Sequence, residues 1–317
     1  MQQPIAVLYE HPEWFKPLFA ELDRRDAPYV ALQAADHVYD PDERSSPYAL
    51  VVNRMSPSAW MRGQRAAIFH TLRYLEQLDE IAVPVLNGLR AFRFELSKAA
   101  QYSLMTRLGL RHPVTRVLSR PEQALTAARE LEFPVLLKPN IGGSGAGIQS
   151  FATMDELTDG VRDGGIDFGI DHVGLLQEHL PAQDDVIVRI EIVGGEFLYA
   201  IRLLLTPGTF NLCPADYCEL PGIADGVSGR GLPVQAYRPP SEIIDGARRL
   251  VAAAGMDVGG VEYLINARDG QPYFYDVNAL SNFVADAPNV IGFNPYVNLV
   301  DLIVERAEVS APRVSAA

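Results

Sequence analysis

A lysine followed by a glycine-rich loop is the first feature of the sequence that could do chemistry. The apolar run at 135–137 predicts a short strand, which delivers Lys138 and is stopped by Pro139. Residues 141–147, Ile-Gly-Gly-Ser-Gly-Ala-Gly, then carry almost no side chains. Glycines let the backbone approach an anion and point N–H groups at its oxygens, and the lysine adds a mobile positive charge. The stretch predicts a phosphate site, with a plain hairpin turn as the alternative.

Two familiar phosphate motifs do not fit this stretch. The loop does not end in a lysine followed by serine or threonine, as a P-loop does. The glycines follow the lysine and do not open the first strand–helix unit, so they are a poor dinucleotide fingerprint.

Acidic and amide side chains form a second candidate site in the last third of the chain. Residues 260–265 and 272–278 predict two strands of a hairpin around Arg-Asp-Gly. Asp276 and Asn278 are two residues apart, so they share a face, and the hairpin brings Glu262 beside them. Two carboxylates and an amide oxygen suit Mg²⁺, with Mn²⁺ as a second possibility. The alternative is that these acidic side chains face solvent, although the aromatic neighbours of Asp276 favour burial and a bound metal.

Composition narrows the class of protein. The chain has 317 residues, 48% of them hydrophobic, which is ordinary for a globular protein of one or two domains. Its net charge of −13 opposes attraction to nucleic acid or to an anionic membrane. No apolar run is long enough to span a bilayer. The two cysteines, Cys213 and Cys218, are interpreted as free thiols rather than a metal clip, and together with the absence of a signal peptide they predict a cytoplasmic protein.

The hydrophobic patterns predict elements that would position both candidate sites. Strands alternate with helices up to about residue 90, which indicates a parallel sheet. One amphipathic helix is expected over 94–108, with Lys98 after Ser97 near its start. A strand at 175–180 follows the glycine loop, and a hairpin around Gly194-Gly195 follows that strand. Arg202 lies among apolar residues of this hairpin, either for a functional reason or as a solvent-facing edge residue. The region 206–233 is an aperiodic loop rich in glycine and proline, of a length that is usually functional or disordered.

Together these segments resemble the ATP-grasp superfamily of carboxylate–amine ligases, most closely its α-glutamate ligase branch. The resemblance covers nearly the whole chain in order: the helix with Lys98, Pro-Val-Leu-Leu-Lys-Pro with its glycine loop, Leu-Gln-Glu-His-Leu at 176–180, the Arg189 strand, Val-Glu at 261–262, and Asp-Val-Asn at 276–278. Each motif is weak alone, and their common order makes the match specific. The resemblance implies an α/β chain with an α+β ATP-grasp part. Its expected divisions are an N-terminal parallel βαβ domain (1–92), a subdomain with the glycine-rich lid (93–182), a subdomain with the metal hairpin (183–310) and a tail (311–317), with antiparallel sheets clamping ATP.

The resemblance also implies roles for individual residues. Lys98 and Lys138 would contact the nucleotide phosphates, with Lys138 also near the adenine, and the glycine loop would close as a lid. Asp185 would bind the ribose, with Asp184 as a competitor. Arg202 would stabilise the oxyanion of a tetrahedral intermediate, with Arg230 as an alternative anion contact. The remaining implied nucleotide contacts are Gly142, Gly143, Ser144, Gly145, Gln177, Glu178 and Leu180, and the implied metal ligands are Glu262, Asp276 and Asn278.

The implied reaction is ATP-dependent formation of an amide or peptide bond through an acyl phosphate, on a small-molecule or peptide substrate. Two alternatives remain: a ligase that modifies a protein side chain or terminus, and a catalytically silent nucleotide-binding protein. The superfamily makes a homodimer or homotetramer plausible. The segments where the substrates would bind depart from the α-glutamate ligase pattern, because Leu-Ser-Asn-Phe at 280–283 replaces Ser-Pro-Gly and only Asn211 survives from the polar segment after Arg202. The substrate of that branch is therefore not transferred.

Overall fold

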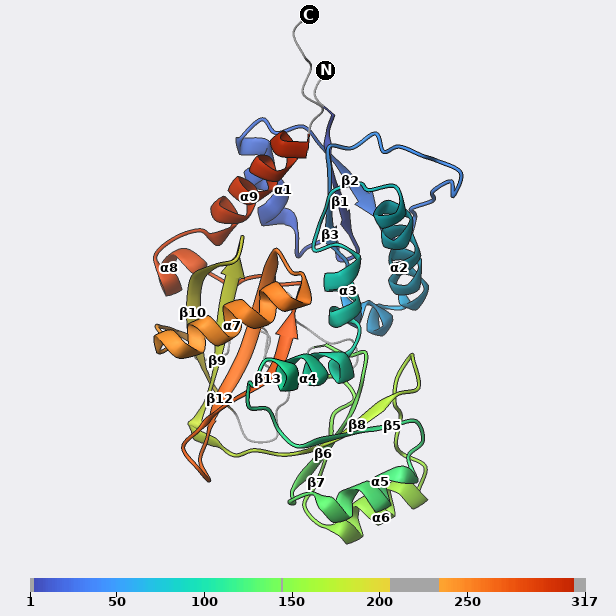
Figure 1. Ribbon diagram of the computed structural model, residues 1–317, viewed down its shortest axis with the longest axis vertical. Helices are drawn as coiled ribbons and strands as arrows, with labels where there is room; N and C mark the ends of the chain where they lie inside the picture. The colour runs from blue at the N-terminus through green and yellow to red at the C-terminus, as the bar shows by residue number, and fades with distance from the viewer. Residues whose placement is uncertain (1–2, 144, 206–233, 311–317) are drawn as a thin grey trace, which may run out of the picture.

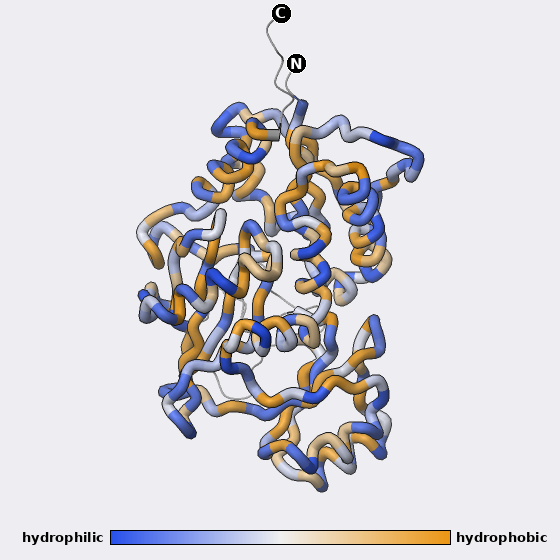
Figure 2. Tube along the Cα trace, in the orientation of Figure 1, coloured by the Kyte–Doolittle hydropathy of each residue, from blue (hydrophilic) through white to orange (hydrophobic). Residues whose placement is uncertain are grey.

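Three β-sheets follow one another along the chain, as the sequence predicts (Figure 1). The computed structural model describes residues 3–143, 145–205 and 234–310. Within them, hydrophobic residues concentrate along the strands, while hydrophilic residues mark turns and outer helix faces (Figure 2). None of the helices in these ranges has the length and apolar character needed to cross a membrane.

The first sheet is parallel and has the strand order β2-β1-β3-β4. Of its central strands, β1 is a continuous apolar run and β3 is buried at all five positions, because both faces of a parallel sheet are covered. The elements of this part are β1 (Ile5–Tyr9), α1 (Lys16–Arg24), β2 (Tyr29–Gln33), β3 (Leu50–Arg54), η1 (Pro57–Arg62), α2 (Arg65–Glu80) and β4 (Val85–Leu86).

The C-terminal helix α9 (Pro295–Ser310) returns to this first sheet, which the sequence analysis did not anticipate. It packs beside α1 (Figure 1), and Leu299, Val300 and Ile303 share a hydrophobic core with α1 and β3. Arg25, which follows the last residue of α1, forms an ion pair with Asp301 of α9. The first core therefore uses both ends of the described chain, and the predicted domain boundaries stay a prediction.

The second sheet is antiparallel, with the order β5-β8-β6-β7, and carries Lys138. The glycine loop connects β6 to β7, so it is a hairpin connection as well as a candidate lid. Two short helices cover one face of the sheet (Figure 1). The elements are β5 (Thr115–Leu118), α5 (Gln123–Ala127), η2 (Ala128–Glu130), β6 (Val135–Pro139), β7 (Gln149–Phe151), α6 (Met154–Arg162) and β8 (Gly174–Glu178).

The third sheet is antiparallel, with the order β11-β10-β9-β12-β13, and carries the acidic hairpin. Side chains of β9 and β12 alternate between two hydrophobic cores, one under α7 and one toward the first sheet. The elements are β9 (Ala182–Val193), β10 (Glu196–Leu204), β11 (Val234–Tyr237), α7 (Ser241–Ala254), β12 (Val258–Asn266), β13 (Pro272–Asn278) and the short α8 (Ala287–Ile291).

The single helix expected over 94–108 is wrong, because the chain forms two helices there. These are α3 (Leu89–Glu95) and α4 (Lys98–Arg107), separated by Leu96 and Ser97. Ser97 has an extended backbone, and its hydroxyl accepts the hydrogen bond of the Ala100 N–H, so it is the N-cap of α4. Lys98 is consequently the first residue of a helix, where it reaches the centre of the molecule.

Candidate functional site

A pocket of about 500 Å³ lies where the three sheets meet. Each part of the chain contributes to its wall: Ser58 from the first, Lys138 and the glycine loop from the second, Asp276 from the third. Of the predicted residues, those that line the pocket are Lys98, Lys138, Gly142, Gly143, Gly145, Gln177, Glu178, Leu180, Asp185, Glu262, Asp276 and Asn278.

A row of charged side chains crosses the floor of the pocket on three adjacent strands. Arg189 of β9 is the register partner of Glu262 on β12, and Glu262 is the partner of Asp276 on β13. Register partners project from the same face of a sheet, so the three side chains point together. The Arg189 Nη1 atom donates to Glu262 Oε1 at 2.9 Å.

Arg189 is the buried centre of this row, a role that the sequence analysis did not assign. Its Nε donates to Glu191 Oε1 at 2.6 Å, and its Nη2 donates to Ser281 Oγ at 3.3 Å. Burial alone would lower the pKa of Arg189, but the charges of Glu191 and Glu262 outweigh burial and raise it. A Cβ atom on Gly260 would lie 2.3 Å from Arg189 Nη2, so the glycine makes room for the guanidinium.

Lys98 and Asp276 join α4 to the acidic hairpin of β12 and β13. Lys98 Nζ donates to Asp276 Oδ1 at 2.6 Å, and both side chains are largely buried. Burial opposes charge on both groups, but the ion pair outweighs it, raising the pKa of Lys98 and lowering that of Asp276. Asn140, which ends the Lys-Pro-Asn sequence after β6, fixes the start of α4: its Oδ1 accepts from the Ala99 N–H at 3.0 Å. The residue after the lysine strand thus positions the helix that bears Lys98.

The three predicted metal ligands fit a hard divalent cation. Glu262 and Asp276 are opposite one another, and Asn278 Nδ2 lies 3.4 Å from Asp276 Oδ2. All three line the pocket and offer oxygen atoms, the donors that Mg²⁺ prefers. Among the residues described, no group of three or more His, Cys, Asp or Glu side chains could hold a metal by itself. Any ion bound here would therefore depend on the Asn278 amide, water and the nucleotide for its remaining ligands.

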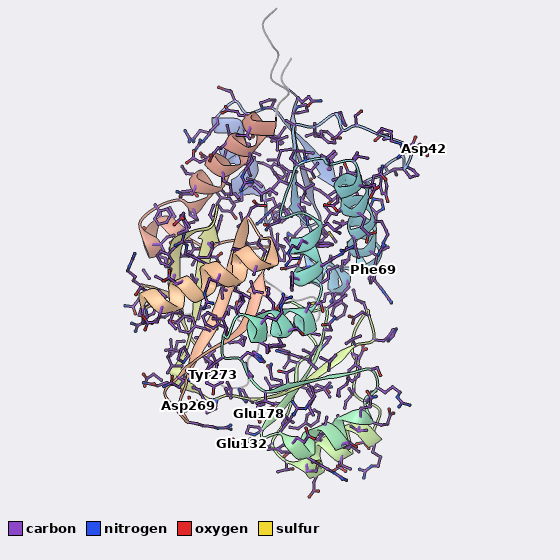
Figure 3. All side chains as sticks on the ribbon, in the orientation of Figure 1. Asp42, Phe69, Glu132, Glu178, Asp269 and Tyr273 are labelled. Atoms are coloured by element: carbon purple, nitrogen blue, oxygen red, sulfur yellow. The ribbon has the colours of Figure 1, made fainter. Side chains whose placement is uncertain are left out.

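The segment 177–185, which the resemblance assigns to nucleotide binding, lies at the junction of the second and third sheets. The Glu178 carboxylate turns away to accept the hydrogen bond of the Glu132 N–H at 2.9 Å, and the two residues lie side by side in Figure 3. This leaves the backbone of Glu178, rather than its carboxylate, for contacts in the pocket, while the neighbouring Gln177 side chain contacts Lys138. Asp185 lines the pocket and Asp184 is not among the lining residues, so position favours Asp185 of the two ribose candidates.

Arg202 lies away from the other predicted residues. It is the register partner of Val188, so it projects from the opposite face to Arg189. Its side chain is exposed, with its guanidinium carbon 4.0 Å from the centre of the Tyr237 ring. The pocket wall does not include it. Ser144, Asn211, Cys213, Cys218 and Arg230, and the 311–317 tail, fall outside the described residues.

Glu95, which the sequence analysis passed over, is a buried carboxyl in the pocket wall. It is the last residue of α3 and accepts a hydrogen bond from the Ala279 N–H, just beyond Asn278. Burial raises the pKa of Glu95 to about 7. The only sequence signal was its place three residues before Lys98 on what looked like one helix.

The Glu95 carboxyl should make stability depend on pH. The pKa of Glu95 is raised in the folded chain, so protonated Glu95 favours folding. This contribution to stability is fully present below the unfolded pKa of about 4.3 and is lost as pH rises through the folded pKa of about 7. We expect the free energy of unfolding of the wild type to fall by about 3 kcal/mol from pH 5 to pH 8 on account of this carboxyl, and Glu95→Gln to abolish that fall, measured by urea unfolding at both pH values. Glu305→Gln, an exposed glutamate of α9, is the control. Equal pH dependence in Glu95→Gln and the wild type would contradict this assignment.

Sequence comparison finds distant relatives among ligases and synthases, and no family model matches the chain. The chain is 27% identical over 232 residues to a D-alanine–D-alanine ligase of Levilactobacillus brevis, covering 70% of this chain and 59% of that protein. It is 24% identical over 276 residues to the carbamoyl phosphate synthase large chain of Rubrobacter xylanophilus, covering 82% of this chain. The chain spans only a quarter of the length of that synthase.

Solved structures match over nearly the full length. The ATP-grasp ligase PsnB, complexed with a phosphomimetic precursor variant, Mg and ADP, has a TM-score of 0.68 at 17% identity, covering 97% of this chain and 100% of PsnB. A RimK-domain ATP-grasp protein of Sphaerobacter thermophilus has a TM-score of 0.68 at 18% identity, covering 94% and 98%. The D-alanine–D-alanine ligase of Bacillus anthracis with ATP has a TM-score of 0.67 at 15% identity, covering 98% of both chains.

Proposed function

Because the chain has the ATP-grasp fold of these ligases, we propose that it is an ATP- and Mg²⁺-dependent carboxylate–amine ligase. It would phosphorylate a carboxylate to an acyl phosphate, which an amine attacks to give an amide, with release of ADP and phosphate. The observation that supports this most directly is the convergence of Lys98, Lys138, the glycine loop and the Glu262–Asp276 pair on one pocket.

The side chains have complementary tasks in this proposal. Lys98 and Lys138 neutralise nucleotide phosphates, which matters because phosphoryl transfer depends on positioning and charge stabilisation. Glu262, Asp276 and Asn278 hold Mg²⁺, which when bound neutralises charge on the phosphates. The glycine loop covers the pocket and keeps water from the acyl phosphate. Arg189 replaces Arg202 as the arginine beside the metal residues, and it orients Glu262.

The substrate class of this proposal is a small molecule or a peptide. PsnB was also solved with a precursor peptide and AMPPNP, which keeps modification of a peptide or protein as a second candidate. The third alternative, a silent nucleotide binder, is disfavoured because such a protein has no need of a complete Glu-Asp-Asn set beside two lysines.

The proposed function is tested by ADP release with a panel of carboxylates paired with amines and short peptides. We expect ADP release above the ATP-only background for at least one pair, with loss of the signal when EDTA removes Mg²⁺. Tight ATP binding without ADP release from any pair would favour the silent binder. Release only with peptide acceptors would favour the second candidate.

A further inference from the structure

Lys138 is a buried ammonium held by neutral acceptors. Lys138 lies in the pocket wall and is only 6% exposed. Its Nζ donates to Tyr102 Oη at 2.8 Å and to Gln177 Oε1 at 2.9 Å. Within the described part of the chain, no carboxylate lies within ion-pair distance of this nitrogen. Asp276, the acid of the neighbouring strand, is already paired with Lys98. The charge of Lys138 therefore depends directly on the two uncharged groups that it touches.

The two acceptors are anchored to different sheets. Gln177 lies on β8, and its Nε2 donates to Thr115 Oγ1 on β5 at 2.8 Å, so it is fixed within the second sheet. Tyr102 lies on α4, and its hydroxyl donates to the Tyr275 carbonyl on β13 at 2.8 Å. A carbonyl only accepts and an ammonium only donates, so the phenol proton goes to Tyr275 and its lone pairs face Lys138.

The same phenol therefore links the lysine of the second sheet to the metal strand of the third. Tyr275 is the residue before Asp276, and Tyr102 lies one helical turn after Lys98, on the same side of α4. Through Tyr102, Lys138 is connected by hydrogen bonds to β13, and the Asp276 side chain of the same strand is paired with Lys98.

Electrostatics makes the Tyr102 contact consequential. Burial, followed by the positive charge of Lys98, lowers the pKa of Lys138 to about 7, while Asp276 and Glu262 oppose that shift. Burial raises the pKa of Tyr102, so it remains a neutral phenol. The other titratable group beside the phenol is His112, whose ring centre lies 5.4 Å from that of Tyr102. At neutral pH the charge on Lys138 is therefore sensitive to the loss of one acceptor.

We propose that Tyr102 is a positioning residue for the nucleotide: its oxygen accepts a hydrogen bond from Lys138 and holds this lysine in the pocket wall from a fixed point on β13. This inference rests on the proposed function for the identity of the ligand as ATP. The contact between Tyr102 and Lys138 itself does not depend on that function and can be tested without a nucleotide.

The test is Tyr102→Phe, which removes the acceptor oxygen and keeps the ring. Losing an acceptor disfavours the ammonium, so the titration midpoint of Lys138 should fall by about one pH unit, measured by ¹³C NMR of the lysine ε-carbons. Lys138→Met identifies the resonance. By calorimetry, the affinity for a non-hydrolysable ATP analogue with Mg²⁺ should fall about tenfold at pH 8 but only about twofold at pH 6, where Lys138 is mostly charged in the wild type and about half charged in the variant.

Ser103→Ala is the matched control, because it removes a hydroxyl from the adjacent position of α4 whose single partner among the described residues is the Ala99 carbonyl. Its Lys138 midpoint and its analogue affinity should equal those of the wild type. If Tyr102→Phe does not fold, 3-fluorotyrosine at position 102, whose oxygen is a poorer acceptor, should lower the midpoint in the same direction.

An unchanged midpoint, or an affinity loss equal at all pH values, would overturn the inference and leave Tyr102 a packing residue. Failure of the proposed function looks different, because the wild type itself would then bind the analogue without releasing ADP from any substrate pair. A wild type that does not bind the analogue at all would overturn the nucleotide role of Tyr102 and of Lys138 together.

Discussion

Asp276→Asn is expected to abolish Mg²⁺-dependent ADP release while the chain stays folded. The substitution keeps the volume of the side chain but removes a charge from the proposed metal site and from the ion pair with Lys98. Removing one partner of a buried ion pair lowers the free energy of unfolding by about 3–5 kcal/mol when the other charge stays buried without a partner or water. Lys98 lines the pocket, where water can reach it, so we expect a destabilisation of about 3 kcal/mol or less.

The hairpin itself supplies the control for this prediction. Asp269 lies in the turn between β12 and β13, where it accepts a hydrogen bond from the Tyr273 hydroxyl at 2.8 Å (Figure 3). It is not among the residues that line the pocket. Asp269→Asn should keep the turnover of the wild type, measured in the same ADP assay with circular dichroism to check folding. Turnover retained by Asp276→Asn would refute its role at the metal.

Arg189→Met is expected to cause the largest loss of stability of the substitutions considered. It leaves Glu191 and Glu262 buried without their shared cation, which should lower the free energy of unfolding by about 3–5 kcal/mol. Burial raises the pKa of Glu262 while Arg189 opposes that shift, so removing the arginine should raise this pKa further above the unfolded value. The contribution of Glu262 to stability is then fully present at low pH and is lost as pH rises through the folded pKa, so the variant should be less impaired at pH 5 than at pH 8.

Arg202→Met on the adjacent strand is the matched control for stability. Its guanidinium is exposed over Tyr237 and touches no buried acid in the described structure, so the change should stay within about 0.5 kcal/mol. Chemical denaturation of both variants at the two pH values gives the comparison. Equal effects of the two substitutions would mean that the Arg189 network is not the anchor of the pocket floor.

The order of motifs was enough to predict the fold and the place of most candidate residues. The predicted ATP-grasp resemblance and the mixed architecture, with one parallel and two antiparallel sheets, are confirmed. Glu262 and Asp276 could be paired in advance because a short hairpin fixes its own register. The glycine loop and Lys138 could be placed together because they are adjacent in sequence, and both line the pocket, whereas their role at a phosphate stays a prediction.

Contacts between segments far apart in sequence could not be read in the same way. Asn140 caps a helix that begins 42 residues earlier, and Tyr102 meets Lys138 and Tyr275 from a third element. None of these residues belongs to a local pattern of its own. The return of α9 to the first sheet was missed for the same reason, since the apolar pattern of a helix does not identify the surface against which the helix packs.

The sequence by itself determined which residues alternate along each strand, and therefore that Arg189 and Arg202 project from opposite faces once their hairpin is in register. It did not determine which of the two faces borders the pocket, because both arginines stand among apolar neighbours. That was decided when α7 packed against the face that carries Val188, leaving the Arg189 face to meet Lys98, Lys138 and the first sheet. Alternation is a local property of the backbone, whereas the choice of a covered face is made by the burial of whole elements.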